Sequence, residues 1–87
     1  MKPGDTIYCA ERSETWVAGA VNEAEGWVIP LGWPCQREPI AMCAVTESCS
    51  DDESLLVIEQ MAAIRVYDPR KIWAVRELER RGLAVQP

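Results

Sequence analysis

Turn-forming residues divide the first half of this chain into short segments, which limits what those segments can become. Proline and glycine recur from Pro3 to Pro39, and the apolar runs between them are short. Such runs are typical of β-strands bounded by turns. We therefore expect strands at residues 6–11, 15–21, 27–33 and 40–46, with a polar hairpin loop at residues 22–26 and a further loop at residues 34–39.

The third of these segments carries the clearest strand pattern. Large apolar side chains alternate along it, which places one set on a single face: Trp27, Ile29, Leu31 and Trp33. Pro30 lies within the run and cannot donate a ladder hydrogen bond, so we expect an edge strand, a bend or a bulge there. We expect the core of the sheet to contain Trp27, Ile29, Leu31 and Ile40.

Residues 51–64 carry conflicting signals. Ser50 and Glu53 match a helix capping box at their start. The β-branched residues Val57 and Ile58 favour a strand instead, and no Gly, Pro or Asn breaks the run that follows. We prefer a long or bulged strand and keep a helix over the same residues as the alternative.

The clearest helix signal lies near the C-terminus. Asp68 is a favourable N-cap, Pro69 suits the first helical position and Gly82 suits the stop. Apolar side chains between these signals fall on one side, which we expect to pack on the sheet through Ile72, Ala74, Val75, Leu78 and Leu83.

These elements predict a single α+β domain over residues 1–87, with strands mainly in residues 1–67 and one C-terminal helix at residues 68–82. About four or five short strands followed by one helix favour a small, bent antiparallel sheet or a partly open barrel with the helix packed on it. The opening Lys-Pro-Gly-Asp before a strand resembles small Src-homology-type barrels over the start of the chain only, and we transfer no function from it.

The composition excludes several classes of protein. The chain has 87 residues, so its core is small. No apolar run is long enough to span a membrane, and the first residues carry no apolar segment of a secretory signal. We therefore expect a cytoplasmic protein that is not embedded in a membrane.

The net charge of −5 is unevenly distributed along the chain. Residues 1–64 carry three basic and eleven acidic side chains, a net charge of −8, whereas residues 65–87 carry six basic and three acidic side chains, a net charge of +3. This asymmetry argues against a general phosphate-binding surface on the first part and leaves the last part open to one. We predict an acidic surface at Glu47, Asp51, Asp52 and Glu53, for which a solvated loop is the plain alternative.

No catalytic or metal-binding constellation is visible. The chain has no His, which removes the usual general base and the commonest metal ligand. The cysteines lack the paired spacing of zinc ligands, so we expect free thiols and no metal, with a disulfide or a zinc site as alternatives, at Cys9, Cys35, Cys43 and Cys49. No nucleophile, phosphate-loop or dinucleotide motif is present, so we expect no enzyme activity and no cofactor.

Three of the four tryptophans, Trp16, Trp27 and Trp33, lie in expected strands. Because the chain has no Phe, they are needed as core side chains. One of them, if left in a groove of a small barrel, would suit recognition of a proline-rich or extended peptide.

Trp73 is placed differently. In the predicted helix it lies outside the apolar side, and its neighbours one or two turns away are charged and mostly arginine: Arg70, Arg76, Glu77 and Arg80. Trp and Arg are enriched among the hot spots of protein interfaces, so we predict a binding surface formed by these residues. A Trp folded over the helix flank and covered by arginine stems is the structural alternative.

Together these features predict a small non-catalytic interaction protein that binds and inhibits or regulates a larger macromolecule. In character it is similar to small inhibitors encoded by phages and mobile elements, such as anti-CRISPR proteins. We expect a protein partner, and an acidic surface suits a basic, nucleic-acid-binding one. The alternative is direct nucleic-acid binding through the arginines of the C-terminal region, Arg65, Arg70, Arg76, Arg80 and Arg81.

Overall fold

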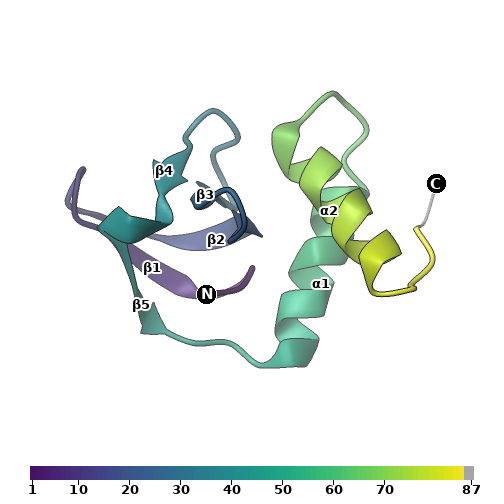
Figure 1. The fold of residues 1–87 in the computed structure, drawn as a ribbon, viewed down its shortest axis with the longest axis horizontal. Helices are drawn as coiled ribbons and strands as arrows, with labels where there is room; N and C mark the ends of the chain where they lie inside the picture. The colour runs from purple at the N-terminus through teal and green to yellow at the C-terminus, as the bar shows by residue number, and fades with distance from the viewer. Residues whose placement is uncertain (86–87) are drawn as a thin grey trace.

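The computed structural model describes residues 1–85, which form five antiparallel strands and two helices. The strands are β1 (Thr6–Cys9), β2 (Glu14–Asn22), β3 (Trp27–Pro30), β4 (Glu38–Pro39) and β5 (Cys43–Glu47), and the helices are α1 (Asp51–Ala62) and α2 (Pro69–Arg80). The sheet has the order β4-β3-β2-β1-β5, and the two helices lie together beside it (Figure 1). The predicted α+β class is confirmed, with two helices where one was expected.

β2 is the longest strand and pairs with two neighbouring strands. Its first half pairs with β1 and its second half with β3, and the register shifts between Ala18 and Ala20. Gly19 lies at this shift, where an added Cβ would be only 2.7 Å from the Cα of Leu31. Such a close approach of two backbones requires glycine. An edge strand, a bend or a bulge was expected at Pro30, and the irregularity lies in the partner strand β2, where Ala18 pairs with this proline.

β3 ends earlier than the alternating pattern predicted. The strand stops at Pro30 and the chain turns, so the expected apolar face is broken after Ile29. Ile29 is buried and Trp27 and Leu31 are half-buried, but Trp33 is 62% exposed. The predicted strand at residues 27–33, for which a bend at Pro30 was one possibility, ends at Pro30 because the chain turns at Leu31 and Gly32, although the Leu31 N–H still donates to the Val17 carbonyl oxygen at 2.7 Å.

The region between β3 and β5 also differs from the prediction. The expected strand at residues 40–46 begins later, because Ile40–Met42 form one turn of 3-10 helix before β5. Ile40 is consequently half-buried rather than central to the core. The two-residue strand β4 lies in the stretch that was expected to be a loop.

The preferred strand at residues 51–64 is wrong, because these residues form α1. The Ser50 side chain accepts a hydrogen bond from the backbone N–H of Glu53 at 3.1 Å, and acidic residues in the first turn complement the helix dipole. Buried side chains recur along the helix at Ser54, Ile58, Met61 and Ala62. Packing of this face outweighs the strand preference of the β-branched residues. The description of residues 1–67 as mainly strands therefore fails after residue 50.

The predicted C-terminal helix is confirmed as α2. Asp68 is its N-cap and accepts a hydrogen bond from the backbone N–H of Arg70 at 2.8 Å. Pro69 is its first residue, and Gly82 follows the helix with a φ of +73°, which suits glycine. Within residues 1–85, neither helix is long and apolar enough to cross a membrane.

Two clusters of buried side chains form the interior. We call the first the sheet core, which consists of Ile7, Ala18, Val21 and Val28. We call the second the helix core, which consists of Ile58, Met61, Ala62, Ala74 and Leu78, with Leu31 and Trp73 packed against it. α2 therefore packs mainly on α1 rather than on the sheet alone, and Ile72 and Leu83 of its expected packing side are exposed.

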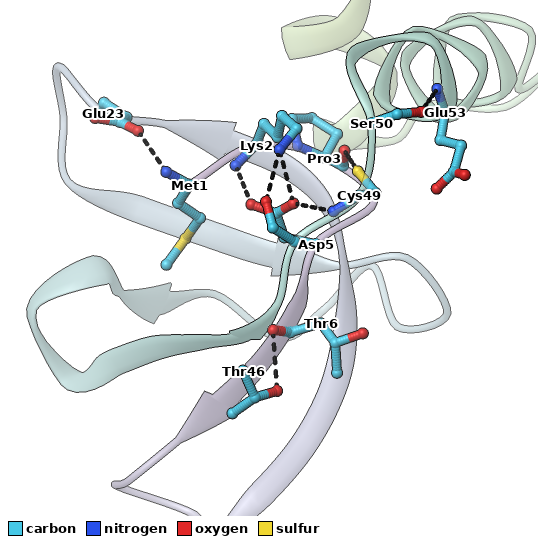
Figure 2. Close-up of polar contacts among 11 residues, drawn as sticks. Met1, Lys2, Pro3, Asp5, Thr6, Glu23, Thr46, Cys49, Ser50 and Glu53 are labelled. Carbon is cyan, nitrogen blue, oxygen red and sulfur yellow. Dashed lines mark hydrogen bonds and ion pairs between the residues drawn. The ribbon is translucent and has the colours of Figure 1, made fainter.

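A buried carboxylate ties the N-terminus to the connection between β5 and α1. Asp5 is 2% exposed and accepts hydrogen bonds from the backbone N–H groups of Lys2 and Cys49, both at 3.0 Å (Figure 2). The Lys2 ammonium pairs with the same carboxylate at 3.2 Å. Burial by itself raises the pKa of Asp5, but the hydrogen bonds from Cys49 and Lys2 outweigh it and leave the pKa below its usual value.

Candidate binding groove

A groove of about 370 Å³ lies between α2 and the β2–β3 hairpin. Three aromatic side chains line it, one from β3, one from the connection between the helices and one from α2: Trp27, Tyr67 and Trp73. Its charged lining residues are Glu25, Arg37, Arg76, Glu77 and Arg80. Segments that are far apart in the sequence therefore meet at one site.

Arg70 fixes α2 against the end of β3 and so positions one wall of the groove. Its guanidinium pairs with the Asp68 carboxylate at 2.7 Å and donates a hydrogen bond to the carbonyl oxygen of Leu31. The hydrogen bonds from Arg70 hold the pKa of Asp68 below its usual value. Arg70 is thus buried and internally paired, and the structure does not place it on the surface where it was predicted to accompany Trp73.

The sheet wall of the groove is built on Trp27. The indole Nε1–H donates to Glu25 Oε2 at 2.9 Å, and Asn22 Nδ2 donates to the same oxygen at 3.1 Å. Arg37 covers the ring, with its Cζ atom 4.5 Å from the ring centroid, which is a cation–π contact. These contacts fix the orientation of Trp27 and keep one positive charge directly over it.

The helix wall combines one half-buried and one exposed aromatic side chain. Trp73 packs against the helix core with part of its ring and lines the groove with the rest. Tyr67 is 89% exposed, although it lies next to the buried N-cap of α2. Two alternatives were considered for Trp73, a binding surface and packing over the helix flank. In the structure its side chain contributes to packing and also lines the groove.

The charged side chains of α2 are largely occupied with each other. The Glu77 carboxylate accepts hydrogen bonds from Arg80 and from Arg81, the latter at 3.0 Å. The hydrogen bond from Arg80 is the main reason that the pKa of Glu77 lies below its usual value. Arg76 has no ion-pair partner within residues 1–85, so it is the α2 arginine in the groove whose charge is not compensated.

A second groove lies between the first half of β2 and the connection that follows β3, and no residue of α2 lines it. It has a volume of about 560 Å³, and its walls include Trp16, Pro30, Leu31 and Trp33. Trp33, which was expected in a strand, lies beyond the end of β3 and is exposed, whereas Trp16 packs against the sheet core. Trp33 is therefore not a core residue, and the use of this groove for peptide recognition stays a hypothesis.

The predicted acidic residues, Glu47, Asp51, Asp52 and Glu53, are all exposed. They follow one another at the end of β5 and in the first turn of α1. Negative charge in the first turn stabilises a helix, so α1 itself accounts for three of them. Their use as a surface for a partner stays a prediction.

The cysteines show no metal-binding arrangement. Among residues 1–85, no group of three or more Cys, Asp or Glu side chains is placed to hold a metal ion, and all four cysteines are free thiols. Cys9 and Cys43 lie directly opposite each other on β1 and β5. Burial raises the pKa of Cys43 to about 11, and the neighbouring Cys9 adds to the shift. Such a thiol is a poor nucleophile at neutral pH.

No protein-family profile, curated protein or solved structure gives a significant match to this chain. We interpret the groove from its own residues.

The sequence prediction found part of this groove. The structure brings together four of its predicted residues, Trp73, Arg76, Glu77 and Arg80. The prediction placed Trp27 in the core and missed Tyr67 and Arg37. The position of Tyr67, directly before the N-cap of α2, gave no signal for exposure, because a large apolar side chain there often packs against the first turns of the helix. Arg37 gave no signal either, because its contact with Trp27 depends on the folding of the sheet.

Proposed function

We propose that this protein is a non-catalytic binding protein that holds a segment of a partner protein in the groove between α2 and the β2–β3 hairpin. The observation that carries the proposal is the exposure of aromatic side chains at one site. Tyr67 is 89% exposed, and Trp27 and Trp73 beside it are only half-buried. Aromatic side chains of this kind supply much of the binding energy of protein interfaces when a partner covers them.

Because it is exposed, the Tyr67 side chain contributes little to the stability of the isolated chain. Burying a large side chain of this type stabilises a fold by about 1.5–3 kcal/mol, and Tyr67 contributes almost none of this. A partner segment in the groove would cover Tyr67 together with the open edge of Trp73. Binding would then be stabilised by burial of apolar surface that stays exposed in the isolated chain.

The arginine contacts argue against direct nucleic-acid binding as the main function. Arg70 is buried and paired, and Arg80 and Arg81 share one carboxylate on α2. Electrostatic binding to a nucleic acid requires several uncompensated positive charges along one surface. Within residues 1–85, the C-terminal arginines without an ion pair are Arg65 and Arg76, and only Arg76 lines the groove.

The proposal includes inhibition or regulation of the partner. A small acidic chain that occupies a surface of a larger macromolecule acts by competition, in the manner of small phage inhibitors such as anti-CRISPR proteins. We also propose that the bent five-stranded sheet is a partly open barrel that supports the groove. Free thiols suit a reducing place of action such as the cytoplasm.

A display library of random-sequence peptides tests the proposed function directly. The immobilised protein should enrich a defined peptide motif, and Tyr67→Ala and Trp73→Ala should each abolish the enrichment. Tyr8→Ala is the matched control, because Tyr8 is partly exposed on β1 and does not line the groove. Tight binding of a fluorescent oligothymidylate with a steep dependence on salt would favour the nucleic-acid alternative instead. Enrichment that is the same for wild type and both groove variants would overturn the proposal.

A further inference from the structure

The carboxylates that line the groove are already bound by other groups of the chain. Glu25 accepts hydrogen bonds from the Asn22 amide and the Trp27 indole, and Glu77 accepts hydrogen bonds from two arginines. Both are therefore held in place as part of the wall. Neither is positioned as a free partner for a positively charged ligand.

Two of the three arginines that line the groove, Arg37 and Arg76, are in the opposite situation. Arg37 contacts the face of Trp27, and within residues 1–85 neither Arg37 nor Arg76 has a carboxylate partner. Both side chains are exposed and line the same groove, one from the sheet wall and one from α2. Guanidinium groups form their strongest hydrogen bonds with carboxylates, often through two parallel N–H···O bonds. The groove thus has uncompensated donors on both of its walls.

The net charge of the residues that line the groove is also opposite in sign to the net charge of the rest of the molecule. It is lined by three arginines and two glutamates, whereas the whole chain has a net charge of −5. Most acidic side chains therefore lie elsewhere, and at physiological ionic strength charges more than about 8 Å away are largely screened. A negatively charged segment would be attracted to the groove more than to any acidic part of the surface.

We propose that the partner segment is acidic and carries one large apolar side chain. This inference rests on the proposed function and specifies its ligand. The apolar side chain lies among Trp27, Tyr67 and Trp73, and carboxylates on either side of it bind Arg37 and Arg76. The aromatic side chains supply most of the affinity, and the two arginines select the charge of the segment.

Three terminally blocked peptides test this charge preference. They share one central leucine and carry glutamate, glutamine or lysine at the neighbouring positions. Binding is followed through the indole N–H signals of the protein in two-dimensional NMR, with Trp27 and Trp73 reporting on the groove and Trp33 on the second groove. The glutamate peptide should bind about threefold to tenfold more tightly than the glutamine peptide, and the lysine peptide should bind most weakly. The difference should shrink when salt is added.

Charge-neutralising variants locate the preference. Arg37→Gln and Arg76→Gln together should remove the advantage of the glutamate peptide over the glutamine peptide, because this ratio depends on the two charges even if loss of the Arg37 contact with Trp27 weakens both peptides alike. Arg65→Gln is the matched control, because Arg65 is exposed and lies outside the groove. Tyr67→Ala should instead weaken all three peptides, since it removes part of the shared apolar contact.

The outcomes separate this inference from the proposed function. If the glutamine or lysine peptide binds as tightly as the glutamate peptide at the Trp27 and Trp73 signals, the acidic preference is wrong and the groove is still a peptide site. If the preference survives in the double arginine variant, the arginines do not cause it and the inference fails. If no peptide shifts these two signals at any soluble concentration, the inference fails as well, and the display library alone then decides the proposed function.

Discussion

The sheet core and the helix core are stabilised in different ways. Buried polar groups reinforce the sheet region: Asp5 binds two backbone N–H groups, and Glu38, 3% exposed, accepts a hydrogen bond from Arg12 at 2.8 Å. The helix core consists of apolar side chains, and its buried ion pair, Asp68 with Arg70, joins it to the end of β3. The candidate groove lies along this junction. The two walls of the groove therefore belong to regions with different stabilising contacts.

The largest expected effect is the loss of packing in the helix core. Leu78 is 2% exposed, and Leu78→Ala should lower the free energy of unfolding by about 2–4 kcal/mol because it leaves a cavity between the helices. Denaturant unfolding followed by circular dichroism measures this change in the free energy of unfolding. Leu83→Ala, at a 42% exposed position, should change the stability by less than about 0.5 kcal/mol.

The same variant shows whether the two cores unfold together. Cys9 is fully buried in the sheet region, so its reaction with a thiol reagent reports on opening of that region. Faster labelling of Cys9 in Leu78→Ala is expected if both cores form one cooperative unit. Unchanged labelling, despite a lower helix stability, would show that the helices open while the sheet remains folded.

The next effect concerns the polar reinforcement of the sheet region. Asp5→Asn should destabilise the protein by about 1–3 kcal/mol at neutral pH, because the amide cannot serve both N–H groups and the Lys2 ammonium. The pKa of Asp5 is lowered by folding, so its contribution is present above the unfolded pKa of about 3.9 and is lost as the pH falls through the folded value.

Unfolding curves at several pH values check this sign. The difference between wild type and Asp5→Asn should be constant near neutral pH and should shrink in acid. Asp52→Asn, an exposed position in the first turn of α1, should give a smaller difference. An Asp5→Asn difference that does not change down to the most acidic pH would contradict the role assigned to the carboxylate.

Trp73 should give an intermediate effect on stability and a large one on binding. Because it is half-buried, Trp73→Ala should cost about 1–2 kcal/mol, less than the loss of a fully buried aromatic side chain. Binding of a groove peptide should weaken about tenfold or more. Trp33→Ala serves as the control, since Trp33 is exposed in the other groove. A stability loss as large as that of Leu78→Ala with unchanged binding would assign Trp73 to the helix core alone.

The smallest expected change in stability belongs to Tyr67. Tyr67→Ala should leave the free energy of unfolding within about 0.5 kcal/mol of wild type, because the side chain is 89% exposed. Thermal unfolding measures this change, and titration with a groove peptide should show a clear loss of affinity. A marked fall in stability would mean that Tyr67 belongs to the fold rather than to a binding surface.

The two regions also differ in how well the sequence predicted them. α2 was predicted almost to its ends, because its N-cap, first proline and terminal glycine all act locally. α1 was only the alternative to a strand because its β-branched residues favour a strand, and its N-cap, acidic first turn and packing against α2 together favour the helix. The alternation up to Trp33 was misleading for a similar reason, since it does not show that pairing stops at Pro30.

The groove was predicted only where it depends on a single helix. The positions of Trp73, Arg76 and Arg80 follow from helical geometry, so their common face was visible in the sequence. The burial of Arg70 was not, because it depends on a carbonyl group at the end of β3. Tyr67 and Arg37 join the groove through the docking of the helices on the sheet, which no local pattern encodes.

The close backbone approach at Gly19 restricts which residue homologous chains can carry at this position. An added Cβ would lie 2.7 Å from the Leu31 Cα and 3.0 Å from the Pro30 carbonyl oxygen, and these backbone atoms cannot turn aside as a side chain would. Divergent sequences that keep this fold should therefore retain a glycine at this point even after most surface residues have changed. Because the close atoms all belong to the backbone, this requirement holds whatever side chains occupy positions 30 and 31.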